Sequence, residues 1–205
     1  MTAPEASTTT LNLLSAFADR TKRKIIATEA AYPSNAAERV VHHKRTFYMP
    51  ANAEQQCFLA GYSDPKSFEE NAVFFGVFFP VTASRTQTLH IRRKSFLDNL
   101  SFSLRKRRLT SGNTDLDSAA VITGTDRDFI LEILKKPDAV DVIKQILKLP
   151  DVFNVGLNAV DLSFVPAFEQ QSNVGVFTRQ KWVMDADTIE NLFSKTEKLR
   201  KEIQK

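Results

Sequence analysis

The chain contains little of several residue types, and each scarcity excludes a class of site. With a single cysteine, Cys57, it cannot form an internal disulfide. With six glycines and neither a P-loop nor a G-x-G-x-x-G motif, it offers no glycine-rich cradle for phosphate groups. Its longest apolar run, 72–81, is about half of the roughly 20 residues that a membrane-spanning helix requires. We therefore expect no transmembrane segment.

Residues 1–10 lack the positive segment and the apolar core of a secretory signal. A single cysteine is also typical of a reducing compartment. We therefore expect a cytoplasmic location, either for a whole protein or for the soluble part of a larger one. Cys57 itself lies in the apolar run 57–61, which favours a buried, unreactive thiol, with a reactive thiol as the alternative.

The composition that is present supports a packed core. Apolar residues make up 42% of the 205 residues and charged residues 25%, proportions that exclude a largely disordered chain. Sixteen phenylalanines stand against one tryptophan and three tyrosines. Because the phenyl ring has no polar group, we expect most of these rings in the interior.

Hydrophobic periodicity predicts a helix first and strands after it. Apolar residues spaced by three, four and seven indicate a helix that starts at Thr10 and is closed by Pro33. The middle third reads as strands, over 40–49, 57–62, 72–79 and 87–93. The third of these is aromatic and β-branched almost throughout, which favours a central strand covered on both faces. Residues 95–104 fit a strand or a helix, and we favour a helix that buries Phe96 and Phe102.

Helices dominate the last third of the chain. A strand over 116–123 leads into a helix capped by Thr125 or Asp126. Pro137 occupies a position that is favoured at the start of a second helix. An antiparallel strand pair and a terminal helix with an acidic capping box complete the pattern, over 153–165, 174–184 and from 187 onward.

These elements predict an α+β fold, with a mostly antiparallel sheet, helices packed on it, and a helix at each end of the chain. We expect residues 1–9 to be loose and residues 10–205 to form a single α+β domain. A subdivision near residue 110, into 10–109 and 110–205, is the alternative.

The densest charged feature is the segment 85–108, which has eight Lys and Arg residues and one acidic residue, Asp98, on a chain of net charge +4. A positive field this concentrated attracts phosphate groups or carboxylate-rich surfaces. Two basic clusters flank an apolar stretch, and their members are the candidate anion-binding residues: Arg92, Arg93, Lys94, Arg105, Lys106, Arg107 and Arg108. The expected partner is an acidic protein, membrane headgroups or nucleic acid.

Two alternatives for these residues need no external anion. They can form a solvated face whose side chains lie along apolar surface. They can also be neutralised within the fold or between subunits, because residues 109–171 carry ten acidic and five basic side chains. A nucleic-acid site would need exposed aromatic rings among the cations, and the two nearby rings, Phe96 and Phe102, are expected to be buried.

No compact catalytic or metal-binding motif is present. His42 and His43 are adjacent, so on a strand they face opposite sides, and there is no His-x-x-x-His or Cys-x-x-Cys spacing. The D-x-D pairs at 115–117 and 126–128 lack the glycine and the glutamate of an EF-hand calcium loop. We therefore expect no metal site and no cofactor.

The sequence favours a non-catalytic binding or scaffold domain that uses its basic segment against an anionic surface. The first alternative is an enzyme of unknown class with a site assembled from distant residues, for which the candidates are His43, Cys57, His90 and Asp117. The second is a structural homo-oligomer joined through the phenylalanine-rich strand 74–79, if one small core cannot cover it.

Overall fold

The structure is a computed structural model that describes residues 3–32, 43–65, 67, 72–99, 108–179 and 181–205. Its strands are β1 (Ile26–Ala31), β2 (His43–Pro50), β3 (Phe58–Ser63), β4 (Val73–Val81), β5 (Leu89–Arg93), β6 (Ala120–Gly124), β7 (Asn154–Leu157) and β8 (Ser172–Thr178). Its α-helices are α1 (Ala3–Arg20), α3 (Thr114–Ala119), α4 (Arg127–Leu134), α5 (Pro137–Leu147) and α6 (Ala186–Gln204), with short 3-10 helices η1 (Phe96–Asn99) and η2 (Pro166–Phe168). The predicted α+β class, with a helix near each end, is confirmed.

The strands form one antiparallel sheet in the order β1-β2-β3-β4-β8-β7-β5-β6. The first four strands follow one another in space as they do in sequence. By contrast, β8 and β7 come from the C-terminal half of the chain and lie between β4 and β5. Strands from both sides of residue 110 are thus hydrogen-bonded to one another, and the division into domains stays a prediction.

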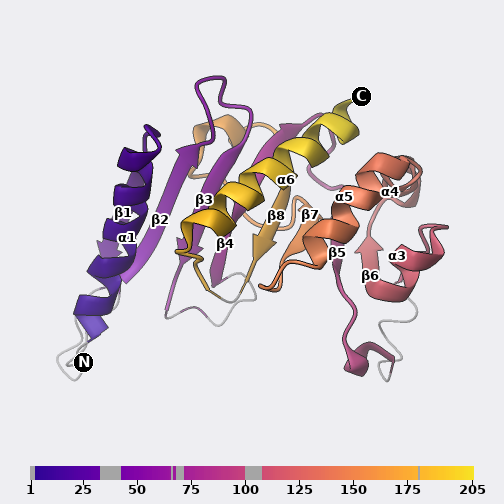
Figure 1. Cartoon of the computed structure of the whole chain (residues 1–205), viewed down its shortest axis with the longest axis horizontal. Coiled ribbons are helices and arrows are strands. Elements are labelled where there is room, and N and C mark those ends of the chain that lie inside the picture. Colours follow the sequence, from indigo (N-terminus) through magenta and orange to yellow (C-terminus); the bar gives the residue numbers. More distant parts are fainter. Residues whose placement is uncertain (1–2, 33–42, 66, 68–71, 100–107, 180) are drawn as a thin grey trace.

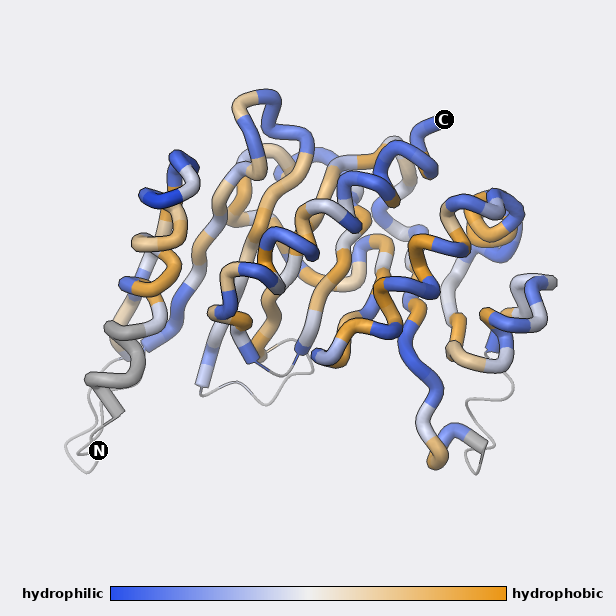
Figure 2. Tube along the Cα trace, viewed as in Figure 1, coloured by the Kyte–Doolittle hydropathy of each residue, from blue (hydrophilic) through white to orange (hydrophobic). Residues whose placement is uncertain are grey.

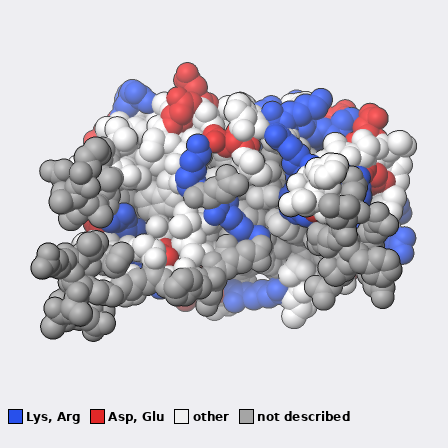
Figure 3. Space-filling model, turned by 90° about the horizontal axis from the view of Figure 1, so that it is seen from below, with Lys and Arg blue, Asp and Glu red and all other residues white. Residues whose placement is uncertain are grey.

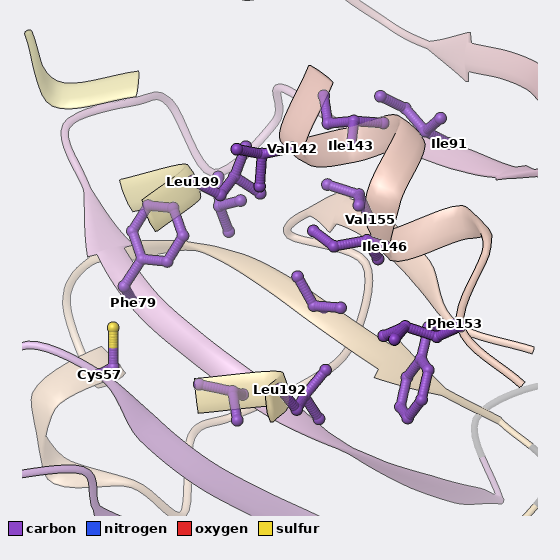
Figure 4. Close-up of a cluster of buried hydrophobic side chains, with 14 of the residues drawn as sticks. Cys57, Phe79, Ile91, Val142, Ile143, Ile146, Phe153, Val155, Leu192 and Leu199 are labelled. Carbon is purple, nitrogen blue, oxygen red and sulfur yellow. The ribbon is translucent and has the colours of Figure 1, made fainter. Parts of the chain in front are cut away.

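One face of the sheet is covered by helices. Figure 1 shows α1, α6 and α5 lying across the same face. Their apolar side chains join those of the sheet in one core, part of which is drawn in Figure 4. There Ile146 of α5 and Leu192 of α6 lie over strand residues such as Phe79 and Val155. Removal of this apolar surface from water is the main favourable term that holds the helices on the sheet.

The opposite face of the sheet carries a smaller, aromatic core. It is covered by the connection between β7 and β8, which contains η2. The Phe168 ring of this connection packs edge-on against Phe58 of β3, with ring centroids 5.4 Å apart. Along β4, Phe75 belongs to the helix-side core and Phe74 to this one. The prediction of a central strand covered on both faces is therefore confirmed.

The helix predicted over 10–33 is wrong in its second half. The helix α1 begins at Ala3, and so includes most of the segment expected to be loose, and it ends at Arg20. Lys22 then takes a left-handed backbone conformation with φ 55°, which turns the chain. The next residues form β1, an edge strand that pairs with β2 in antiparallel register. This pairing is a long-range contact, and it overrides the local helix preference of an Ala- and Glu-containing segment.

Two predictions between residues 95 and 123 are also corrected. Phe96 lies in η1 but is 79% exposed, so its predicted burial is wrong, while Phe102 lies outside the described residues. The segment 116–123 is not one strand, because α3 occupies its first part and β6 begins at Ala120. The start of α3 is fixed by Asn113, whose side chain accepts a hydrogen bond from the Leu116 backbone nitrogen at 3.0 Å.

The predicted starts of α4 and α5 are confirmed. Asp126 caps α4 by accepting a hydrogen bond from the Phe129 backbone nitrogen at 3.0 Å, and α5 begins at Pro137. The cap of α6 is Asp185 rather than a residue of the predicted box, with the Thr188 backbone nitrogen 2.8 Å from its carboxylate. The strands β7 and β8 form the predicted antiparallel pair, although both are shorter than expected.

Candidate anion-binding surface

Arg92, on β5, is neutralised inside the molecule. Its guanidinium donates two hydrogen bonds to the Asp98 carboxylate, from Nη1 to Oδ2 at 2.7 Å and from Nη2 to Oδ1 at 2.5 Å. Asp98 also accepts a hydrogen bond from the Ser95 backbone nitrogen at 2.6 Å. The hydrogen bonds from Arg92 lower the pKa of Asp98 from 3.8 to about 2, so this carboxylate stays charged at neutral pH. Arg92 is thus one half of an ion pair rather than a free cation.

Arg93 is held in place without being neutralised. Its Nε donates to the Leu147 carbonyl at 2.7 Å and its Nη2 to the Leu149 carbonyl at 2.9 Å. These oxygens lie at the C-terminal end of α5, where a helix leaves carbonyl groups without partners. In the described part of the chain, the hydrogen-bond partners of Arg93 are all carbonyl oxygens. The position of this guanidinium is therefore fixed, while no carboxylate of the described ranges pairs with it.

Arg108 is the described member of the second basic cluster. Arg108 donates from Nη2 to the Asp117 carbonyl and, at 2.9 Å, to the Ala120 carbonyl, which ties it to the junction of α3 and β6. After the hydrogen bonds from Arg92, the charge of Arg108 also contributes to the lowered pKa of Asp98. Arg92 therefore binds Asp98 directly, whereas Arg108 acts on this carboxylate only through its charge and makes its hydrogen bonds to carbonyl groups. The other three members of the second cluster lie outside the described residues: Arg105, Lys106 and Arg107.

An open cleft of about 700 Å³ lies next to Arg93. It is lined by Arg93, Asp115, Ser118, Ala119, Lys144, Leu147 and Lys148. We call it the basic cleft, because three of these residues are cations and one is a carboxylate, a balance of +2. The Lys144 ammonium lies 3.3 Å from Asp141 and 3.6 Å from Asp115, and hydrogen bonding to Asp141 raises its pKa. For Lys148, which is exposed, no carboxylate partner is found among the described residues.

Lys94 completes the surface beside the cleft. Its backbone nitrogen donates to the Ala119 carbonyl at 2.8 Å, which continues the pairing of β5 with the chain before β6. Its ammonium group has no ion-pair partner within the described ranges. Of the four described candidates, then, Arg93 and Lys94 have no carboxylate partner among the described residues, Arg92 is paired with Asp98, and Arg108 is hydrogen-bonded to carbonyl groups.

Sequence reasoning missed the two lysines that α5 contributes. Lys144 and Lys148 are four residues apart, so they lie on one side of the helix, opposite the buried stripe that includes Ile143 and Ile146. The only available signal was this spacing, and exposed lysines at such spacing occur on most amphipathic helices. Their proximity to Arg93 depends on where α5 ends on the sheet, which no local pattern gives.

The surface around these residues is mixed in charge. Figure 3 views the molecule from below, the side toward which η1 projects in Figure 1, and shows separate blue groups of Lys and Arg with red carboxylates between some of them. The basic residues therefore form separate groups rather than a single continuous positive face in this view.

The four residues considered for an enzyme site have separate partners. Cys57 is buried in the helix-side core, and its thiol donates to the Glu197 carboxylate at 3.2 Å. Burial, followed by the hydrogen bond to Glu197, raises the pKa of the Cys57 thiol well above its ordinary range. The predicted buried thiol is thus confirmed. His43 lies instead at the β1–β2 edge, with its Nδ1 3.2 Å from the Glu29 carboxylate.

His90 and Asp117 lie elsewhere again. The His90 ring stacks on Phe177, in the aromatic core on the sheet face opposite Cys57, with centroids 6.2 Å apart. Asp117 accepts hydrogen bonds from the backbone nitrogen and the hydroxyl of Ser111, each at 2.8 Å. The structure does not bring the four candidates together. Across the described residues, no group of three or more His, Cys, Asp and Glu side chains is placed to hold a metal ion.

Two further observations bear on partners. Phe75 and Phe79, like their neighbours in β4, are buried within the single chain, which removes the argument for an oligomer built on an uncovered phenylalanine strand. Oligomerisation itself stays a prediction. Within the described ranges, each helix is too short or too polar to span a bilayer.

No protein-family model, curated protein or solved structure matches this chain.

Proposed function

We propose that the chain is a non-catalytic binding domain that holds an anionic partner through the basic cleft and the adjacent Lys94. The observation that carries this proposal is the state of Arg93. Its guanidinium is oriented by two carbonyl groups, so little side-chain entropy is lost on binding, and its charge remains uncompensated by any described carboxylate. Preorganised cations of this kind are suited to carboxylate or phosphate groups.

Local negative charge is too small to neutralise the cleft. Asp115 lines it, and the C-terminal end of α5 contributes at most roughly half a negative charge through its last carbonyl groups, of which that of Leu147 already accepts from Arg93. Arg93, Lys144 and Lys148 oppose these with three positive charges. Lys94 follows Arg93 in the chain and adds a fourth, although it does not line the cleft. Asp141 also pairs with Lys144, yet a positive excess persists at the mouth of the cleft.

The proposal is tested with a pair of charge-matched double variants. Lys94→Ala with Lys148→Ala removes two cations at the proposed site. Lys135→Ala with Lys198→Ala removes two exposed cations, one at the end of α4 and one on α6, so both variants have the same net charge. Binding to heparin and to vesicles that contain phosphatidylserine is measured at increasing salt. The wild type is expected to bind at low salt and to lose affinity steeply as salt rises, because counterion release drives such contacts.

The site variant is expected to bind at least tenfold more weakly than the control variant, since each Lys near an anionic surface contributes about a factor of five. Equal weakening by both variants would show that only total charge matters, which would overturn the assignment to this cleft. Failure of the wild type to bind either polyanion at low salt would overturn the proposed function as a whole.

A further inference from the structure

The tip formed by η1 exposes two adjacent apolar side chains. Phe96 is 79% exposed and Leu97 68%, the highest values among the large hydrophobic residues of the described chain. The next highest is Leu13, at 50%, on α1. Single exposed apolar residues are common on protein surfaces, whereas a neighbouring pair at this exposure marks a contact site.

The tip projects from the body of the molecule and follows directly on the first basic cluster. Figure 1 shows the chain leaving β5 and descending beyond the sheet to η1. In Figure 2 this descending stem is hydrophilic and its tip is hydrophobic. The stem comprises the last two residues of β5, Arg92 and Arg93, followed by Lys94, and the tip is Phe96 and Leu97. Cations therefore lie just behind the apolar end of one projection.

The ion pair described above also fixes the shape of this projection. The Arg92 side chain on the stem is bridged to Asp98, which follows the tip, and Asp98 also holds the Ser95 backbone nitrogen before it. The tip is thus closed at its base by hydrogen bonds from both sides. A loop that is ordered in this way presents its two apolar side chains without a large entropic penalty on binding.

We propose that this tip inserts Phe96 and Leu97 into the interfacial region of a lipid bilayer that carries anionic headgroups, with Lys94 and Arg93 contacting the headgroup phosphates. The inference rests on the proposed function and names its partner. Amphipathic segments at membrane surfaces combine apolar side chains, buried in the outer part of the acyl region, with cations at the headgroup level. The order of residues along the projection matches that layering.

The same observations disfavour the two other classes of anionic partner. A stable protein interface buries about 800 Å² on each side, which two side chains on a narrow tip do not supply. Single-stranded nucleic acid would stack its bases on aromatic rings, and Leu97 offers no ring. A bilayer needs neither a large complementary surface nor a second ring, because a tip can enter it at any point.

Vesicle flotation with full-length protein tests the insertion. Phe96→Ser with Leu97→Ser removes the apolar tip, and both positions are exposed, so the fold is expected to persist. Leu13→Ser is the matched control on another exposed apolar position. The tip variant is expected to lose at least tenfold in partitioning onto vesicles of phosphatidylcholine with phosphatidylserine, because burial of even one such side chain corresponds to about a factor of ten. Its affinity for heparin and the steepness of its salt dependence are expected to match the wild type.

A fluorescent reporter gives a second readout. Phe96→Trp places an indole at the tip, and Leu13→Trp places one on α1 as its control. The emission of the wild-type protein is subtracted from that of each variant. On addition of anionic vesicles, the remaining emission of the Phe96→Trp protein is expected to shift to the blue and to be quenched by lipids brominated on their acyl chains. The Leu13→Trp protein is expected to show neither change.

The outcomes separate this inference from the function on which it rests. If the tip variant binds anionic vesicles as tightly as wild type, or the indole at position 96 is not quenched, insertion is refuted. The proposed function survives that result provided that the Lys94/Lys148 variant still binds more weakly. Equal partitioning onto pure phosphatidylcholine would refute the requirement for anionic headgroups. Tighter binding to DNA or to an acidic peptide than to vesicles, weakened by the same tip variant, would overturn the membrane as the partner.

Discussion

Substitution of Asp98 by asparagine is expected to weaken the fold and strengthen anion binding at the same time. The carboxylate closes the base of the η1 tip and neutralises Arg92. The carboxamide of Asp98→Asn has nearly the same outline but no charge and only one acceptor oxygen, so it cannot accept both hydrogen bonds from Arg92. The substitution therefore frees one guanidinium on the stem behind the tip. One additional cation near an anionic surface is expected to raise vesicle binding about fivefold at low salt. The variant thus reports two separate effects of the ion pair: its contribution to the free energy of unfolding, and the loss of vesicle affinity that results from neutralising Arg92.

The stabilising contribution follows from the pKa of Asp98. Lowering of this pKa from 3.8 to about 2 corresponds to at most about 2 kcal/mol at neutral pH, because one pKa unit is about 1.36 kcal/mol. The Arg92 side chain is 27% exposed, so solvent screening reduces this figure toward about 1 kcal/mol. Because the folded-state pKa is depressed, the contribution is fully present above about pH 4 and is lost as the pH falls toward 2.

A double-mutant cycle in urea denaturation measures this contribution. Wild type, Asp98→Asn, Arg92→Gln and the double variant are compared at pH 7 and pH 5, where the coupling free energy is expected to be about 1–2 kcal/mol and unchanged between the two pH values. A coupling close to zero at pH 7, or one that disappears between pH 7 and pH 5, would refute the reasoning. So would weaker vesicle binding by Asp98→Asn than by wild type, since that variant carries more positive charge.

Two further predictions concern the core. Gly76→Ala is expected to destabilise the fold by at least about 3 kcal/mol, because a Cβ there would lie 2.4 Å from the Val176 carbonyl oxygen. The control is Gly112→Ala, where a Cβ meets no atom within 4 Å and the strain is one of backbone conformation alone. The midpoint of urea denaturation is expected to fall further for Gly76→Ala than for this control. Cys57 is expected to react with iodoacetamide at pH 8 only as fast as the protein unfolds, since burial raises the pKa of its thiol. Rapid alkylation of the native protein, or a large acceleration in Glu197→Gln, would contradict burial as the main cause of this low reactivity.

The sequence alone determined those features that depend on local patterns. The cap at Asp126 and the helix start at Pro137 are signals carried by single residues. The apolar stripes of α4, α5 and α6 repeat every three or four residues, which is a direct consequence of helix geometry. The doubly covered strand β4 was visible as an aromatic run. The α+β class and the buried Cys57 followed from the same kind of evidence in the residues.

The tertiary structure decided the rest, because pairing, burial and charge balance depend on residues far apart in the chain. Residues 26–31 become a strand only because β2 is beside them, against their local preference. Phe96 is exposed because the chain carries it beyond the sheet, away from the two cores formed by the described residues. Of the basic clusters, the fold cancels Arg92 with Asp98 and leaves Arg93 fixed and charged beside Lys148. The number and spacing of the charged residues can be read from the sequence, whereas the folded arrangement determines which of them are paired.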